Sequence, residues 1–251
     1  DVRRGYESRD VMSSSPMNAP LNVSKHLSSS ILLWVRDDQP RETGMEYWKG
    51  PHSGIISATK GLAEYRQIHL AELNPGLWPV APGIETEIPV ERKIDGVAEV
   101  TFKSALSPLL GRKQTKLAFK DEINVFRRTL LYAGLPNSSH WYDLAGGAET
   151  VGARALIYLR RRRGVRAGRF RKVIVEKLVP ALAGTGALRE LRTQAFLPWH
   201  ERLWDTPNVA HDNPPNERFH ASVILGFADD AARDAFLTGR RISDLSEQLT
   251  P

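Results

Sequence analysis

The segments "GLAEYRQIHL" (residues 61–70) and "ALRELRTQAF" (residues 187–196) are two versions of one pattern, 126 residues apart. The same offset relates two further pairs: "SSILLWVRD" at 29–37 with "ALIYLRRRR" at 155–163, and the Leu-Trp dipeptide at 77 with that at 203. A later pair, "DGVAEVTF" ending at Phe102 and "ASVILGF" ending at Phe227, is offset by 125 residues. A near-constant register of this kind indicates two copies of one module.

Each copy combines strand-like and helix-like periods. In the first copy we expect, in chain order, a strand at 30–35, a helix at 43–59, a strand at 65–70, a long loop at 73–92, a strand at 95–103, a helix at 119–131 and a closing strand at 140–144. In the second we expect a strand at 154–159, a helix at 170–182, a strand at 188–196, a long loop at 198–215, a strand at 219–227 and a helix at 229–237.

This order of elements is the ferredoxin-like arrangement, an antiparallel sheet with helices on one face. The other face of each sheet then needs cover, and two sheets packed face to face provide it within one chain. We therefore predict an α+β fold of two tandem ferredoxin-like units. The expected parts are a polar N-terminal tail at 1–28, a first unit at 29–144, a linker at 145–152 and a degenerate second unit at 153–251.

Composition sets the protein class. The 251 residues suit two modules of roughly 100–120 residues each. No apolar run approaches the roughly 20 residues that cross a bilayer, and residues 1–20 have no apolar centre typical of a secretory signal. We therefore expect a cytoplasmic protein that does not associate with membranes. Met17 is a candidate natural start. Cysteine is absent, which excludes disulfides, thiolate catalysis and cysteine-ligated metals.

The net charge of +6 comes from one segment. Residues 160–172, "RRRRGVRAGRFRK", hold eight basic residues and no acid, so the rest of the chain carries 6 minus 8, or −2. The segment is either a solvated basic face or an anion-binding patch. Because no aromatic residues alternate with these bases in a single-strand-binding pattern, we expect no nucleic-acid partner.

The segment "EYWKGPHSGIISATKGLAEYRQ" (46–67) resembles the signature of EthD-like proteins, through Tyr47, Trp48, His52, Leu62 and Tyr65. A later part, "DGVAEVTFKS" and then "FKDEINVF", also resembles that family, and the matching residues are Asp95, Gly96, Glu99, Phe102, Asp121 and Glu122. The likeness covers roughly residues 29–131. The family usually has Gly-Pro after the histidine, whereas Ser-Gly follows here. The second copy has Ile174 and Leu178 at the positions of Trp48 and His52, and so loses the signature.

The resemblance implies a dimeric α+β barrel, in which two ferredoxin-like units form the barrel and the cavity of each unit lies between sheet and helices. Relatives with this fold include cofactor-free cyclases, decarboxylases or dehydratases, monooxygenases and isomerases, so the fold fixes no single reaction. Since the second copy lacks the signature, we expect a functional cavity in the first unit only.

His52 is the leading candidate for catalysis, because an imidazole suits a general acid or base near pH 7; the alternative is a structural histidine bonded to backbone. Tyr65 and His69 lie four residues apart on one strand and share a face, so both can line one pocket. Asp121 is predicted to orient a catalytic partner, although acids at the start of a helix also serve only its dipole. The predicted substrate-binding residues are Tyr47, Trp48, Trp78, Phe102 and Glu122.

The long loop of the second copy, "PWHERLWDTPNVAHDNPPNERFH" (198–220), holds three histidines at spacings of 11 and 9 residues. These spacings match no compact metal motif, so we predict no metal and interpret the loop as an aromatic, histidine-rich lid. Nucleotide-binding glycine motifs are absent, and no single histidine stands out as a haem ligand, so we predict no cofactor.

Together these patterns predict a cofactor-independent lyase, cyclase or isomerase that uses His52 on an apolar, carbonyl-bearing or aromatic small molecule. Two alternatives stay open: a non-catalytic small-molecule-binding or accessory protein, and a metal- or haem-dependent oxygenase. A homodimer also stays open.

Overall fold

The computed structural model describes residues 21–73, 76–144 and 150–249. The first unit consists of β1 (Val23–Val35), α1 (Arg41–Tyr47), a π-helical turn η1 (Trp48–His52), α2 (Ser53–Ser57), β2 (Leu62–His69), the 3-10 turn η2 (Val90–Arg92), β3 (Gly96–Phe102), α3 (Ser107–Leu110), α4 (Arg112–Glu122) and β4 (Phe126–Tyr142). The second consists of β5 (Ala153–Leu159), α5 (Ala167–Val173), the π-turn η3 (Ile174–Leu178), α6 (Val179–Ala183), β6 (Glu190–Phe196), the 3-10 turn η4 (Glu201–Leu203), β7 (Ala221–Phe227), α7 (Asp230–Leu237) and α8 (Arg240–Leu249).

The repeat recurs at the level of single elements. The bounds of α1, η1 and α2 each reappear 126 residues later as those of α5, η3 and α6, and β3 reappears as β7 after 125 residues. Even the π-turn, which is rare in proteins, is present in both units at the same place. The predicted α+β fold of two tandem ferredoxin-like units is therefore confirmed.

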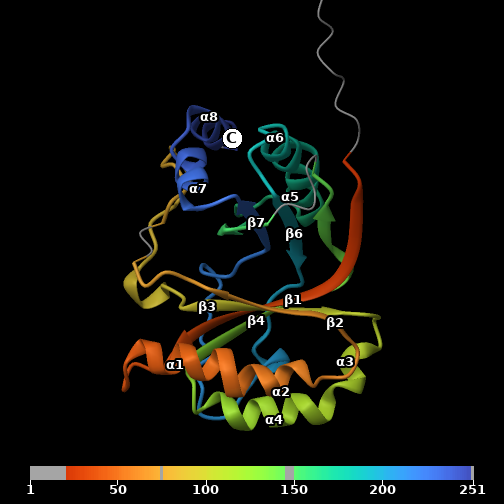
Figure 1. The fold of residues 1–251 in the computed structure, drawn as a ribbon. Helices are drawn as coiled ribbons and strands as arrows, with labels where there is room; N and C mark the ends of the chain where they lie inside the picture. The colour runs from red at the N-terminus through yellow and green to blue at the C-terminus, as the bar shows by residue number, and fades with distance from the viewer. Residues whose placement is uncertain (1–20, 74–75, 145–149, 250–251) are drawn as a thin grey trace, which may run out of the picture.

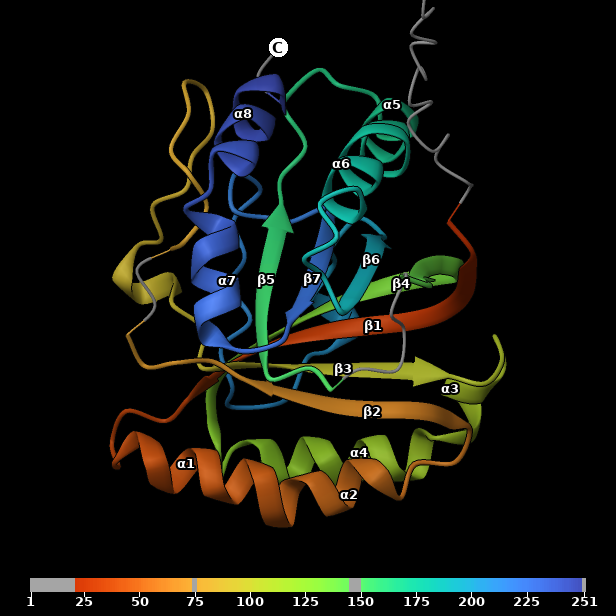
Figure 2. The ribbon, with the colours of Figure 1, turned by 45° about the horizontal axis from the view of Figure 1, so that its top comes forward.

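The strands form one curled antiparallel sheet in the order β2-β3-β1-β4-β6-β7-β5. The helices of the first unit and those of the second lie at opposite ends of the molecule, with the strands between them (Figures 1 and 2). The β4–β6 pairing joins the two halves of the sheet. Curling of this sheet brings β2 and β5, its two edges, to the same interior.

Each strand of the sheet divides its side chains between a helical layer and the interior. In β1, Ile31, Leu33 and Val35 pack with the first-unit helices, whereas Leu32 and Trp34 face the interior with Tyr158 of β5. Burial on both faces explains why the strand is continuously apolar from Ile31 to Val35 rather than alternating. The apolar core of the second-unit helical layer has more buried residues and includes Leu178.

Several predicted boundaries differ from the structure. Strand β1 begins at Val23, inside the segment assigned to the tail, while residues 1–20 and most of the linker lie outside the described residues. The helix predicted at 119–131 is wrong: α4 ends at Glu122, and Phe126 begins the 17-residue strand β4. Apolar residues there satisfy both periods, and pairing with central strand β1 decides for a strand. The last element is a helix, α8.

Within the described ranges, every helix is too short or too polar to span a membrane.

Candidate functional site

The predicted residues His52, Asp121 and Tyr47 meet in the helical layer of the first unit. His52 ends the π-turn η1, and its Nδ1 lies 2.8 Å from Oδ2 of Asp121, near the end of α4. Tyr47 donates its hydroxyl to the other carboxylate oxygen, also at 2.8 Å. Phe126 stands edge-on to the imidazole, with ring centroids 5.4 Å apart. One carboxylate thus fixes the histidine and the tyrosine together, as in an oriented acid–base pair.

Burial and hydrogen bonding set the charges of this cluster. His52 is only 3% exposed, and burial lowers the pKa of its imidazole although Asp121 acts in the opposite direction. Burial opposes ionisation of Asp121, but the hydrogen bonds from His52, Tyr47 and Asn124 outweigh it and leave its pKa below the ordinary value. The pair is therefore a neutral imidazole beside a carboxylate at pH 7. Among the described residues, none hydrogen-bonds to Nε2 of His52.

Tyr65 and His69 share one face of β2, as their spacing predicts, and both meet Trp48. The ring of His69 stacks on that of Trp48 with centroids 4.6 Å apart. Gln67 lies between them and donates to both the Trp48 carbonyl and the Tyr65 hydroxyl, at 2.8 and 2.9 Å. Trp48 is fully buried in the first-unit core, and Phe102 packs against the same core. Trp48 and Phe102 therefore lie in the apolar core of this helical layer.

Glu122, the neighbour of Asp121, faces a different partner: the long loop of the second unit. We call residues 197–220 the crossing loop, because it reaches the first unit, where Val209 joins the core and Trp204 packs against it. Glu122 accepts hydrogen bonds from Trp204 Nε1 at 2.7 Å and from Thr206 Oγ1 at 2.6 Å. Only 2% of Glu122 is exposed, and this burial raises its pKa to about 7.

The long loop of the first unit makes the reciprocal contact. Trp78 packs against the core of the second unit and donates its indole N–H to Ser246 of α8, at 3.0 Å. Trp78 and Trp204 are the repeat-related tryptophans at the 126-residue offset. Trp78 therefore belongs to the helical layer opposite the one that holds Trp48 and Phe102.

The crossing loop also forms an open cleft of about 770 Å³, which the sequence did not predict. We call it the loop cleft; its lining residues are Trp199, Glu201, Arg202, Asp205, His211, Asp212, Asn213, Pro214 and Arg218. All come from the second-unit loop, whereas the sequence favoured a functional cavity in the first unit only. None of the predicted site residues lines it. The only advance signal was the cluster of tryptophan, histidine and charged residues in this loop.

Two features of the loop cleft concern hydrogen bonding. Asn213 is only 5% exposed; its amide N–H₂ donates to the Tyr132 hydroxyl at 2.9 Å, while its Oδ1 is buried without a partner. Buried polar atoms of this kind are rare in proteins, where most are hydrogen-bonded. Arg218 lies over the ring of Trp199, with its guanidinium carbon 4.9 Å from the centroid, and so leaves planar donors at the cleft.

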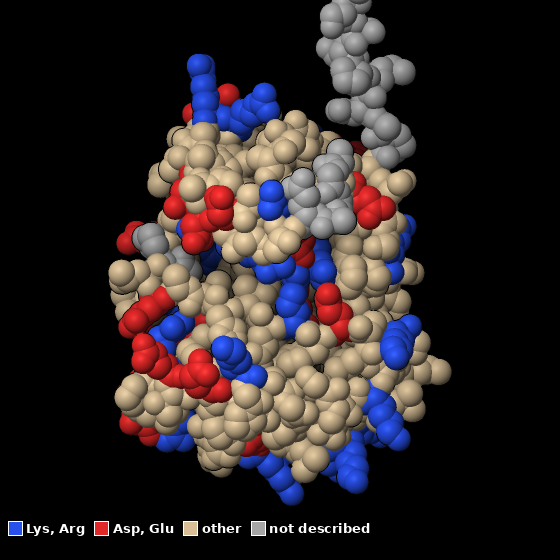
Figure 3. All heavy atoms as spheres, in the orientation of Figure 1, with Lys and Arg blue, Asp and Glu red and all other residues tan. Residues whose placement is uncertain are grey.

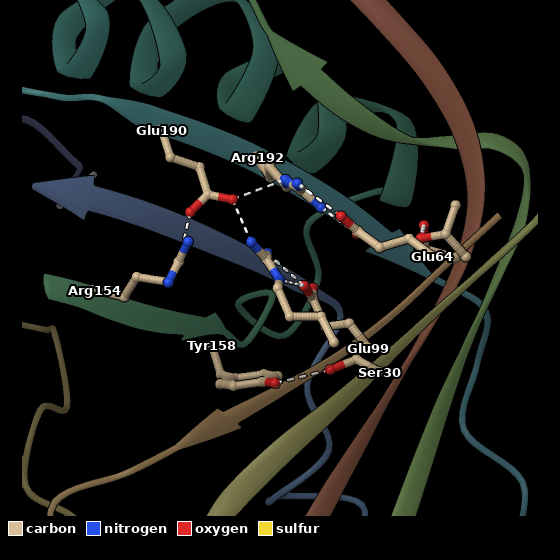
Figure 4. Close-up of polar contacts among 10 residues, drawn as sticks. Ser30, Glu64, Glu99, Arg154, Tyr158, Glu190 and Arg192 are labelled. Atoms are coloured by element: carbon tan, nitrogen blue, oxygen red, sulfur yellow. Dashed lines mark hydrogen bonds and ion pairs between the residues drawn. The ribbon is translucent and has the colours of Figure 1, made fainter. Parts of the chain in front are cut away.

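A third cluster of polar residues lies in the interior of the curled sheet, between the strands of the first unit and those of the second (Figure 4). Arg192 of β6 pairs with Glu64 of β2 at 2.6 Å, and Arg154 of β5 pairs with Glu190 at 2.6 Å. Arg66 of β2 pairs with both Glu99, at 2.6 Å, and Glu190. Three arginines and three glutamates therefore balance one another, and Arg66 and Arg192 link the first unit to the second.

Burial affects the acids of this interior network unequally. It raises the pKa of Glu99 despite the opposing charge of Arg66. At Glu190 the charges and hydrogen bonds of Arg66 and Arg154 outweigh burial, and its pKa is lowered. On the molecular face shown in Figure 3, acidic and basic side chains lie close together rather than forming a field of one sign. The balanced charges of the interior network are typical of a structural ion-pair network.

The three histidines of the crossing loop have separate partners. His200 accepts a hydrogen bond from the Arg202 amide, His220 accepts one from the Arg161 amide, and His211 contacts two carbonyls. In the part of the chain that the structure describes, no three His, Asp or Glu side chains gather in a way that could hold a metal ion.

Comparisons with known proteins address the fold. No protein-family model matches the chain, and no curated protein matches it. Among solved structures, an anthrone oxidase-like protein is similar at 10% identity and a TM-score of 0.51, covering 90% of this chain and 86% of its own. This likeness supports the fold described above, a curled antiparallel sheet built from two α+β units. Membership of the EthD-like family stays a prediction.

Two further solved structures show weaker likeness. A candidate monooxygenase from Lactobacillus acidophilus NCFM has 11% identity and a TM-score of 0.47, covering 88% of this chain and 86% of its own. A mutant chlorite dismutase from Candidatus Nitrospira defluvii has 7% identity and a TM-score of 0.45, with 90% and 86% covered. At these identities the likeness concerns architecture alone.

Proposed function

We propose that this protein binds a small polar molecule in the loop cleft. The observation that carries the proposal is a cleft of about 770 Å³ that is lined by an aromatic ring, two arginines, acidic side chains and the buried Asn213, whose Oδ1 has no partner. Ligand sites in proteins are typically 300–1,000 Å³ and combine aromatic walls with a few polar groups. Trp199 supplies such a wall, and Arg202 and Arg218 supply donors on the same lining.

The lining also indicates what kind of molecule fits. The carboxylates of Glu201 and Asp205 accept hydrogen bonds from N–H or O–H groups of a ligand, and Asn213 Oδ1, buried beside them, is a further acceptor without a partner. The guanidinium groups of Arg202 and Arg218 need acceptors, and carboxylates suit them best. A molecule that carries both kinds of group, such as an amino acid or a hydroxy acid, satisfies this lining better than the apolar substrate that the sequence favoured.

Ligand-observed NMR tests the proposal. The full chain is screened against amino acids, hydroxy acids and nucleosides, and affinities are then compared in Asn213→Asp and in Asn216→Asp. The first variant alters the buried amide; the second places the same charge on an exposed residue of the same loop outside the lining. We expect to find ligands whose affinity falls about tenfold or more in Asn213→Asp, as it does when a buried hydrogen bond is lost. Their affinity should be unchanged in Asn216→Asp. Equal effects of both variants, or no ligand at all, would contradict the proposal.

A second candidate function, acid–base catalysis, is favoured by the 2.8 Å contact between His52 Nδ1 and Asp121. A carboxylate that holds Nδ1–H leaves Nε2 as a base, the arrangement of activated histidines in enzymes. The cluster is buried, so a substrate would reach Nε2 only if the helices of this layer part. If this role is correct, turnover should fall by roughly 10²–10⁴-fold in His52→Gln. Asn124→Ala should keep most of the activity.

A further inference from the structure

The crossing loop is fastened to the first unit by a short list of contacts. Beyond the bonds from Trp204 and Thr206 to Glu122, the loop pairs with β4 through backbone: Ala210 N–H donates to the Arg127 carbonyl at 3.0 Å, and Thr129 N–H donates to the Ala210 carbonyl at 3.1 Å. The same loop builds the loop cleft. Whatever loosens these contacts therefore changes the cleft.

His211 contributes the second fastening. Its Nε2 lies 2.9 Å from the Thr206 carbonyl, within the loop, and its Nδ1 lies 3.0 Å from the Thr129 carbonyl, on β4. Both partners are acceptors. A neutral imidazole donates from one nitrogen only, whereas the imidazolium donates from both. The side chain therefore lies between the loop and β4, within hydrogen-bond distance of both carbonyls.

Glu122 is the other titratable group at this junction. It receives two hydrogen bonds yet is almost fully enclosed, so its ionised form is costly. Burial raises its pKa to about 7, while Thr206, Trp204 and the charge of His211 act in the opposite direction. Docking of the loop around Glu122 thus favours the protonated carboxyl.

The other charged groups nearby are already paired. On β4, Arg128 contacts Asp212 of the loop at 2.8 Å. On α4, Asp121 faces His52 and Tyr47 rather than the loop. Arg92 donates to the Asp212 carbonyl and pairs with Glu217. None of these pairs involves Glu122, which leaves that carboxyl as the group whose proton changes on docking.

We infer that protons regulate the loop cleft: the crossing loop docks with a proton on Glu122 and loosens when that residue loses it. This inference rests on the proposed function in one respect only: it takes the loop cleft to be the ligand site. The sign follows from this carboxyl. A carboxyl whose pKa is raised by docking destabilises the docked loop as pH rises from 4.5 past 7. Alkaline solution therefore opens the loop.

The molecule contains its own control. Trp204 reports on the titratable Glu122, whereas its repeat-related counterpart Trp78 donates to Ser246, which has no charge to lose. Both tryptophans are long-loop residues packed on the helical layer of the other unit. A general effect of pH on the protein would move both indole N–H signals, and a local effect would move one.

The experiment follows the two indole N–H resonances of the full chain between pH 5 and pH 8.5, assigned with Trp→Phe variants. We expect the Trp204 resonance to titrate and that of Trp78 to stay constant. In Glu122→Gln, which mimics the protonated carboxyl, the Trp204 resonance should lose this titration. The protection factor of the Ala210 amide in the wild type should fall roughly tenfold between pH 6 and pH 8, from the linkage of a carboxyl moved from 4.5 to about 7.

The outcomes separate the two proposals. A Trp204 signal that is constant with pH, or that titrates unchanged in Glu122→Gln, overturns the inference, as does an Ala210 protection factor independent of pH. These readouts need no ligand. A titrating loop in a protein that binds none of the screened molecules would therefore retain the regulation of the loop and refute the ligand site, while ligand binding with a constant loop would do the opposite.

Discussion

Arg66 and Arg192 occupy equivalent positions 126 residues apart, and each forms an ion pair with the glutamate that stands two residues before the other. Arg66 pairs with Glu190, and Arg192 pairs with Glu64. Reciprocal contacts of this kind define the isologous interface of a two-fold dimer. The two units of this chain therefore associate as two identical subunits would, with the long loops and their tryptophans exchanged in the same reciprocal manner.

Removing one charge from this interior network should destabilise the protein strongly. In Arg66→Met, Glu99 and Glu190 lose a buried partner, and we expect the free energy of unfolding to fall by about 3–5 kcal/mol. Arg233→Met breaks ion pairs with exposed aspartates and should change it by less than about 1 kcal/mol. Urea denaturation measures both, and equal losses would contradict a structural role for the network.

Glu122→Gln should stabilise the protein at alkaline pH. Because folding raises the pKa of Glu122 from 4.5 to about 7, the ionised side chain costs about 3 kcal/mol at pH 8, and Gln removes that cost. The gain should shrink toward pH 5, because Glu122 is protonated in the folded state there. By pH 4 it is mostly protonated in the unfolded chain as well. Glu201→Gln, an exposed acid in the same loop, should show no such trend in denaturation curves taken from pH 5 to pH 8.

His52 should give the opposite pH dependence. Its folded-state pKa is lowered by burial, so the unfolded chain binds a proton that the folded protein does not. Stability from this group is fully present above pH 6.5 and is lost as pH falls through the folded-state pKa. His52→Gln should flatten the acid side of the stability profile. His200→Gln, an exposed loop histidine, should leave the profile unchanged.

The hydrogen bonds of the two exchanged tryptophans, Trp78 and Trp204, should contribute different amounts to the free energy of unfolding. Trp204→Phe leaves the buried Glu122 with one donor fewer, and we expect a loss of about 2 kcal/mol or more at pH 8 that diminishes at pH 5. In Trp78→Phe, Ser246 still donates to the Pro79 carbonyl, so a smaller loss of about 1 kcal/mol, constant with pH, is expected. Identical pH profiles for the two variants would argue against a titrating Glu122.

The repeat made the architecture predictable, because a constant offset constrains strands and helices in pairs. The strand β4 was missed because its apolar residues fit a helix as well, and only pairing with β1 distinguishes the two. The resemblance between sequences singled out Tyr47, His52 and Asp121, and the structure brings these three side chains together.

The loop cleft could not be predicted from periodicity, because it depends on where an irregular loop lies. Glu122 was expected beside Asp121 at the start of a helix and instead ends α4, where a loop from the other unit covers it. Contacts between segments some 80 residues apart, such as Glu122 with Trp204, leave no local pattern in the chain.

The paired π-turns bear on the history of His52. A π-turn accommodates an extra residue in a helix, and such an insertion at one position in both units is most simply a single event inherited by both copies at duplication. In the second copy that frame carries Leu178 inside an apolar core, with no acid–base group. The same irregular backbone therefore holds His52 in one unit and Leu178 in the other, so the π-turn does not depend on a histidine at this position.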